Sequence, residues 1–215
     1  MKKSISILLI VASLLSLGSY AMAKGGQYRN QSVNIDNLPK QELSQKEKEG
    51  LLLMREEEKL AKDVYAALYQ KWNHRIFNNI SSSEQQHTSR VKDLLDKYQL
   101  DDPVASMVPG KFNNPEMQKL YNQLVKQGSS SHLAALKVGA EIEDLDIKDL
   151  KLLLAETDNK DIQLVYQNLY RGSRNHMRSF NKQLLRSGVS YKAKYISQTE
   201  LQSIISSPME RGNQK

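Results

Sequence analysis

The chain has no cysteine among its 215 residues. It therefore forms no disulfide, offers no thiolate to a metal, and carries no lipid on a processed amino-terminal cysteine. After residue 23 no stretch is apolar and long enough to span a bilayer. Strand-like alternation and nucleic-acid recognition motifs are also missing, and the basic residues are interspersed with acids. These absences favour a helical domain that binds no nucleic acid and has no stable membrane insertion.

The first 23 residues predict a secretory signal peptide. They combine Lys2 and Lys3, a short apolar run and a small-residue ending, Ala21-x-Ala23. Removal of this segment leaves 29 basic residues against 24 acidic ones, so the formal net charge falls from +7 to +5. We expect export across the inner membrane and a periplasmic location. The modest positive charge indicates no particular partner, and a homodimer stays open.

Apolar residues recur at the helical period along most of the chain, which predicts an all-α fold. The expected segments are a polar leader, a four-helix bundle domain and a short polar tail, at residues 24–43, 44–195 and 196–215. Three long helices are expected at about residues 44–72, 74–98 and 130–155, and a fourth follows a tight turn at residues 157–161 and runs to about residue 186. Pro115 opens and Gly128 closes a short extra helix between the second and third of them. The pattern predicts an antiparallel bundle with one long crossover.

Glu84 and His87 fall on the same inward stripe of the second helix as apolar residues such as Ile80 and Val91. A buried carboxylate or imidazole needs a partner, because a buried unpaired charge costs several kcal/mol or changes its protonation state. A metal ion is one such partner, and Glu-x-x-His on a bundle helix is half of a di-metal motif. Ser81 and Glu84 also have capping-box spacing, so a helix start at Ser81 is the alternative.

The remaining long helices offer further inward polar groups. Glu58 lies on the apolar stripe of the first helix, although Glu57 aligns with a second set of apolar residues and stays an alternative. In the third helix Glu143 is inward, with Asp146 one turn further on. His176 is inward in the fourth helix; a core histidine bonded to the backbone is its other interpretation.

Four phrases of the sequence resemble a known family: EEEKLAKDVY, FNNISSSEQQH, GAEIEDLDIKDL and NLYRGSRNHMRSF. Over residues 45–195 the chain resembles the rubrerythrin branch of the ferritin-like superfamily, and most closely the domain-of-unknown-function 2202 family. The resemblance implies a ferritin-like bundle and assigns five metal ligands. Terminal carboxylates would be Glu58 and Glu143, the bridging carboxylate Glu84, and the imidazoles His87 and His176.

One position departs from the superfamily pattern, because Ser173 stands where the second bridging glutamate belongs. Asp146 could compensate for it. Gly172 beside it is costly inside a helix, by about 1 kcal/mol relative to alanine, which suggests close packing or an irregular helix. Tyr65 is a packing residue, or a donor that orients a ligand carboxylate from the second shell.

Carboxylates with two imidazoles suit iron or manganese, with zinc as an alternative. The resemblance implies two iron ions and reduction of peroxide or dioxygen, with no catalytic residue beyond the metal ligands and no organic cofactor. Since the chain lacks the cysteine-ligated iron domain of many rubrerythrins, an electron donor would be another molecule. Two alternatives remain: a metal-binding or sequestering module without turnover, and a metal-free helical interaction domain.

Overall fold

A computed structural model of the chain describes residues 35–104 and 108–211. These residues form six α-helices and one short 3-10 helix and contain no strand, which confirms an all-α fold. The α-helices are α1 (Gln45–Trp72), α2 (Arg75–Tyr98), α3 (Pro115–Gly128), α4 (His132–Glu156), α5 (Lys160–Arg186) and α6 (Gln198–Ser206), and the 3-10 helix is Ile35–Asn37. The predicted signal peptide lies outside the described residues.

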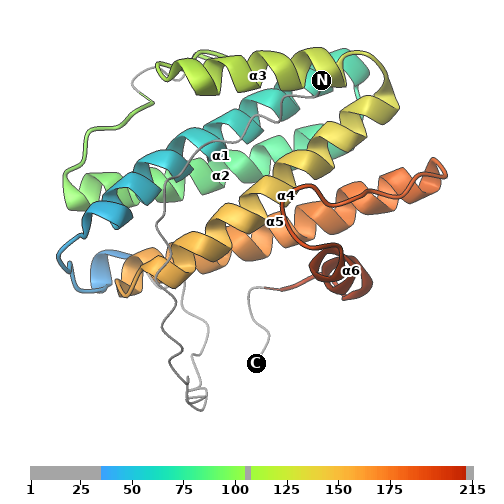
Figure 1. The fold of residues 1–215 in the computed structure, drawn as a ribbon. Coiled ribbons are helices and arrows are strands. Elements are labelled where there is room, and N and C mark those ends of the chain that lie inside the picture. Colours follow the sequence, from blue (N-terminus) through green and yellow to red (C-terminus); the bar gives the residue numbers. More distant parts are fainter. Residues whose placement is uncertain (1–34, 105–107, 212–215) are drawn as a thin grey trace, which may run out of the picture. The chain divides into compact units, whose positions relative to one another are not determined.

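The four long helices pack as two hairpins, α1 with α2 and α4 with α5 (Figure 1). Helix α1 also contacts α4, and α2 contacts α5, so the two hairpins face each other. Helix α3 lies in the long connection between α2 and α4 and packs against α1 and α4. Among the described residues no helix is long and apolar enough to cross a membrane.

Helix ends follow local sequence signals. Ser44 and Glu47 form the expected capping box at the start of α1. Asn73 ends α1 in the left-handed conformation, with φ of 48°, and the His74 side chain caps α2. Because α2 begins at Arg75, Glu84 lies in its interior and the alternative in which Glu84 caps a helix from Ser81 is wrong.

The apolar core consists of two clusters, one toward each end of the bundle. One contains Tyr65, Phe77 and Phe180; the other contains Met54 and Leu94. Along each long helix the change from one cluster to the other falls near the middle. Inward polar residues lie between the two clusters, in a part of the bundle that we call the middle band.

The segment after α5 differs from the expected short polar tail. Helix α6 forms inside residues 196–215, and Leu201 and Ile204 are buried. The predicted domain end at residue 195 is therefore too early. Two apolar residues three positions apart suffice for one inward face of a short helix, and the Ser197 side chain accepts from the backbone N–H of Glu200 to start it.

Candidate metal centre

The five residues that the sequence proposes as ligands meet in the middle band. They come from all four long helices: Glu58 from α1, Glu84 and His87 from α2, Glu143 from α4 and His176 from α5. The three glutamates are at most 1% exposed. The structure therefore brings together side chains separated by as many as 118 positions, from Glu58 to His176.

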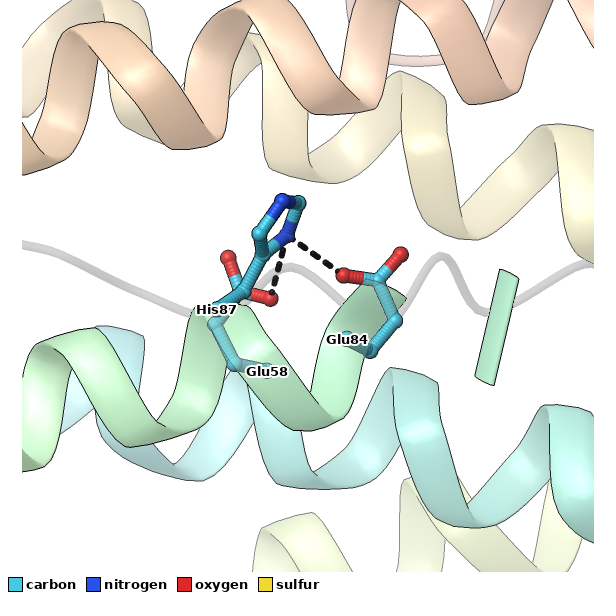
Figure 2. A group of neighbouring side chains, drawn as sticks. All are labelled: Glu58, Glu84 and His87. Carbon is cyan, nitrogen blue, oxygen red and sulfur yellow. Dashed lines mark ion pairs between the residues drawn. The ribbon is translucent and has the colours of Figure 1, made fainter. Parts of the chain in front are cut away.

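Glu84 lies between the two imidazoles. Its Oε2 is 2.6 Å from His87 Nδ1, and its Oε1 is 2.8 Å from His176 Nδ1. Figure 2 shows Glu84 and Glu58 both facing the same nitrogen of His87. The two rings stack with centroids 5.6 Å apart. One carboxylate thus has an oxygen for each histidine.

The ligand atoms form two groups that share Glu84. Glu58 Oε2 completes the first group at 3.3 Å from His87 Nδ1, and Glu143 Oε2 completes the second at 3.4 Å from His176 Nδ1. Within each group one atom per residue lies within 4.8 Å of the others. We call Glu58, Glu84 and His87 the first triad, and Glu84, Glu143 and His176 the second triad.

Most of these atoms are buried without a hydrogen bond of acceptable geometry to the described residues. They are both Glu58 oxygens, Glu84 Oε1, Glu143 Oε2, and Nδ1 of each histidine. Ion pairs of 2.6 to 3.4 Å join the two histidines to these carboxylates, but the atoms named here make no directed hydrogen bond to the described residues. Buried polar atoms normally find partners, so this concentration of unpaired ones requires an explanation. Such convergence is expected of ligands around a cation.

The charges of the centre are strongly coupled. Burial raises the pKa of Glu58 to about 8, with a further contribution from the charge of Glu84 and an opposing one from His87. Burial also acts on Glu84, but His176 and His87 outweigh it and hold the pKa of Glu84 well below its usual range. Burial favours neutral His176; the charges of Glu84 and Glu143 overcome it and raise the pKa of His176 to about 10. Without a metal, the folded protein therefore retains protons here at neutral pH.

Two further residues contact the candidate ligands. The Tyr65 hydroxyl donates to Glu143 Oε1 at 2.5 Å, the contact expected of an orienting donor. Ser83 Oγ lies 3.1 Å from Nε2 of His176, on the ring edge opposite the centre. Sequence analysis missed Ser83, because three consecutive serines carry no signal for which one reaches α5.

Ser173 does not replace the missing glutamate. Its hydroxyl donates to the backbone oxygen of Leu169 at 3.2 Å, within its own helix. Helix α5 continues unbroken through Gly172, and a Cβ at that residue would lie 2.5 Å from His87 Cε1. The glycine thus reflects close packing, not an irregular helix.

Asp146 and Glu57 are buried near the triads but belong to neither group of converging atoms in the described residues. Burial raises the pKa of Asp146 well above its usual value, and the charges of Glu58 and Glu143 add to this. For Glu57, burial has the largest effect on the pKa, followed by the charge of Asp149. Asp146 is therefore the nearer reserve carboxylate for the centre, and Glu57 the more distant one.

The donor set fits a divalent cation. Carboxylate oxygens dominate, each triad adds one imidazole, and the facing atoms lack other partners. Iron and manganese prefer such oxygen-rich sites, which zinc can also occupy. The fold and this centre together define a class: all-α proteins with a carboxylate–histidine cluster buried between two helical hairpins.

The chain belongs to the family described as "Uncharacterized protein domain (DUF2202)", whose model matches residues 47–208. This confirms the resemblance to that family. An uncharacterized protein of Methanocaldococcus jannaschii, MJ0754, is 55% identical over 178 residues, which are 83% of this chain and 96% of the relative. A crystal structure of the hypothetical protein MJ0754 from Methanococcus jannaschii DSM 2661 has a TM-score of 0.79 at 55% identity, and the match covers 81% of this chain and 99% of that one.

Proposed function

We propose that this protein binds two divalent metal ions in a ferritin-like four-helix bundle, with iron as the first choice and manganese or zinc as alternatives. One observation carries the proposal: Glu84 is shared by two buried triads whose facing atoms have no other partners among the described residues. The first triad would hold one ion and the second triad the other. Two antiparallel hairpins joined by a long crossover support the ferritin-like arrangement.

Protons alone neutralise this centre poorly. The two triads contain three carboxylates and two imidazoles, and Asp146 and Glu57 add two buried acids nearby. Protonation lowers the negative charge, but it leaves the unpaired oxygens without directed partners. Two cations would satisfy the same atoms and remove the cost of burying like charges together.

The two positions differ in the freedom of their terminal carboxylates. Both oxygens of Glu58 are unpartnered, whereas one oxygen of Glu143 already accepts from Tyr65. Ser173 adds nothing to the second position, because its hydroxyl is bonded within α5. We therefore expect the first triad to bind metal more tightly than the second. Asp146 is the residue that would reduce this difference.

A redox-active pair of ions held here would supply electrons for reduction of hydrogen peroxide or dioxygen. The protein would contribute orientation and exclusion of water. Glu84 contacts both rings, and the apolar clusters cover the centre on two sides, although the two histidine side chains keep 14% and 11% of their surface exposed. Because the chain has no cysteine, its electron donor would be another molecule. The predicted signal peptide supports a periplasmic location for this activity.

Elemental analysis of the full mature chain, purified without a metal-affinity tag, tests the binding proposal. The protein is stripped with a chelator and then loaded anaerobically with Fe²⁺, Mn²⁺ or Zn²⁺. We expect two ions per chain, and less than one in Glu84→Gln, because that residue belongs to both triads. Glu156→Gln on the exposed end of α4 is the matched control and should retain two. A wild-type protein that retains no metal would leave the interaction-domain alternative.

Stopped-flow spectroscopy of the iron-loaded, reduced protein tests turnover. We expect peroxide or dioxygen to oxidise it faster than free Fe²⁺, and His87→Ala to remove this advantage while Ser173→Ala retains it. If metal binds but oxidation is no faster than for the free ion, the redox proposal fails. The protein would then be a metal-binding or sequestering module.

A further inference from the structure

Gly172 lies in the interior of α5, where the backbone conformation does not require a glycine. The helix runs unbroken from Lys160 to Arg186, and Gly172 does not have the positive φ seen at Gly110 and Gly188. Glycine inside a helix costs about 1 kcal/mol relative to alanine. The reason for it therefore has to be sought in what a side chain would meet.

The neighbour of Gly172 is the ring of His87 on α2. A Cβ added at Gly172 would lie 2.5 Å from Cε1 and 2.7 Å from Nε2 of that ring. Real Cβ contacts are essentially never below 3.0 Å, so the ring would have to move. The Nδ1 atom of the ring, which is bonded to Cε1, faces Glu84 and Glu58 at 2.6 Å and 3.3 Å from their oxygens. The imidazole therefore lies between the carboxylates of Glu58 and Glu84 and the backbone of α5 at Gly172.

The two histidines are positioned by different means. His176 has the hydroxyl of Ser83 against its outer nitrogen at 3.1 Å. The outer edge of His87 instead lies against the backbone of Gly172, with Nε2 and Cε1 nearest to the missing Cβ. The position of the His87 ring is therefore limited by steric contact with α5, whereas the His176 ring is held by a polar contact with Ser83.

We propose that Gly172 is the positioning residue for His87, and through it for the first metal position. This inference rests on the proposed metal-binding function. A side chain at residue 172 forces the His87 ring away from its place and moves Nδ1 relative to Glu58 and Glu84. The second triad contains no atom of His87 and meets it only through the shared Glu84 and the stacked ring of His176, so we expect its geometry to change less than that of the first triad.

Gly172→Ala is the test, and Gly50→Ala is its matched control. Gly50 is also an interior helix glycine with a 2.5 Å obstruction, but the obstructing atom is the end of the flexible Leu153 side chain, two turns of α1 from Glu58. Both variants gain the same helix propensity. Metal-free protein is titrated anaerobically with Mn²⁺ and bound metal is counted after gel filtration. We expect two ions in wild type and Gly50→Ala, and at least a tenfold weaker first position in Gly172→Ala.

A double variant shows whether Gly172 acts through His87. In a His87→Ala background the ring is gone and the Cβ at residue 172 has space. We expect His87→Ala/Gly172→Ala to fold and to bind Mn²⁺ as His87→Ala alone does. A further loss in the double variant, or equal Mn²⁺ binding by Gly172→Ala and Gly50→Ala, would overturn the inference.

NMR of metal-free protein separates this inference from the proposed function. The ¹H–¹³C signal of Cε1 in His87 should shift in Gly172→Ala, by more than that of the stacked His176, while both signals in Gly50→Ala should stay near their wild-type positions. An unchanged His87 signal means that Gly172 does not position the ring. If the His87 signal shifts but the wild-type protein binds no Mn²⁺, the steric contact between residue 172 and His87 is confirmed. The proposed function and the role of Gly172 in metal binding are then both overturned.

Discussion

Glu143 and Asp144 are neighbours on α4, and both are completely buried, yet the fold surrounds them in opposite ways. The carboxylate of Asp144 accepts from the Tyr191 hydroxyl at 2.9 Å and from the backbone N–H groups of residues 194–196. Glu143 accepts only from Tyr65, and its other oxygen faces His176 without a hydrogen bond to the described residues. Burial alone therefore does not identify a functional acid.

Two other buried polar residues resemble Asp144. Lys59 pairs with Asp63 at 2.5 Å and donates to the backbone oxygens of Val108 and Lys111, which fastens the crossover to α1. Asp161 accepts from Tyr98 and pairs with Lys97. Asp63 Oδ1 accepts no hydrogen bond from the described residues but pairs with Lys62 at 3.3 Å, so lysine cations of the chain balance both acids. In the triads they do not, and this difference is the structural basis for proposing a bound cation.

Asp144→Ala should give the largest effect. It leaves a tyrosine hydroxyl and three backbone N–H groups without their acceptor, so we expect a loss of about 3–5 kcal/mol in the free energy of unfolding. Denaturant unfolding of metal-free protein measures this, with Asp158→Ala on the exposed α4–α5 turn as control. A loss below about 1 kcal/mol would mean that residues 191–196 are not anchored by Asp144.

The pH dependence of metal-free protein should reveal the unsatisfied centre. Glu58, with a pKa raised from 4.5 to about 8, and His176, with a pKa raised from 6.5 to about 10, both hold protons that the unfolded chain releases. Stability from Glu58 is fully present below pH 4.5 and is lost as the pH rises to about 8. The His176 contribution is lost between pH 6.5 and 10.

We therefore expect the free energy of unfolding to fall by about 1.4 kcal/mol per pH unit from pH 5 to 6.5, and by up to about twice as much from pH 6.5 to 8, where Glu58 and His176 both contribute. Equilibrium denaturation at a series of pH values measures the slope, and Glu58→Gln should flatten it. The depressed pKa of Glu84 has the opposite sign, but it acts only below pH 4.5. A free energy of unfolding that increases with pH between pH 5 and 8 would contradict the assigned protonation states.

Ser83→Ala should weaken metal binding at the second triad by about 10–100-fold, because it removes the partner of the outer nitrogen of His176. The first triad should be unaffected. Isothermal titration calorimetry with Mn²⁺ compares Ser83→Ala with the control Ser82→Ala. The Ser82 hydroxyl donates to the backbone oxygen of Asn78 on an exposed face of α2. Equal binding by the two variants would show that Ser83 does not hold the ring.

Glu143→Gln should have the smallest effect on the metal-free protein, within about 1 kcal/mol of wild type despite complete burial. Glutamine retains an oxygen for Tyr65 and removes the cost of burying a charge, while it also removes the charge that faces His176, so the gain and the loss nearly cancel. Thermal and denaturant unfolding measure this against Asp144→Ala. A loss above about 3 kcal/mol would show that Glu143 is structurally satisfied in the same way as Asp144.

Much of the architecture could be predicted from local pattern. The four long helices lie within a few residues of their expected bounds, and the short helix Pro115–Gly128 has the expected ends. The inward placement of Glu84 and His87 followed from their spacing relative to Ile80 and Val91, since helical periodicity is a local property. Their role as metal ligands stays a prediction.

The tail could not be predicted in the same way. Helix α6 is short, and it packs on α5, whose Arg178 donates to the backbone oxygen of Ile204. Residues 191–196 are held by Asp144, about 50 positions earlier in the chain, which accepts from the Tyr191 hydroxyl and from the backbone N–H groups of residues 194–196. Nothing in a polar stretch of sequence indicates such a distant acceptor.

The sequence by itself determined the helices and the set of acids and histidines that point inward, because a 3.6-residue period fixes which side chains share a face. Only the tertiary structure decided which of those acids are satisfied. Glu143 and Asp144 are adjacent and equally buried, but they project to different sides of α4 and meet different neighbours. The packing of α2 against α5 brings Ser83 next to His176, and it brings Gly172 next to the ring of His87. Such contacts depend on how the helices pack, which no local period encodes.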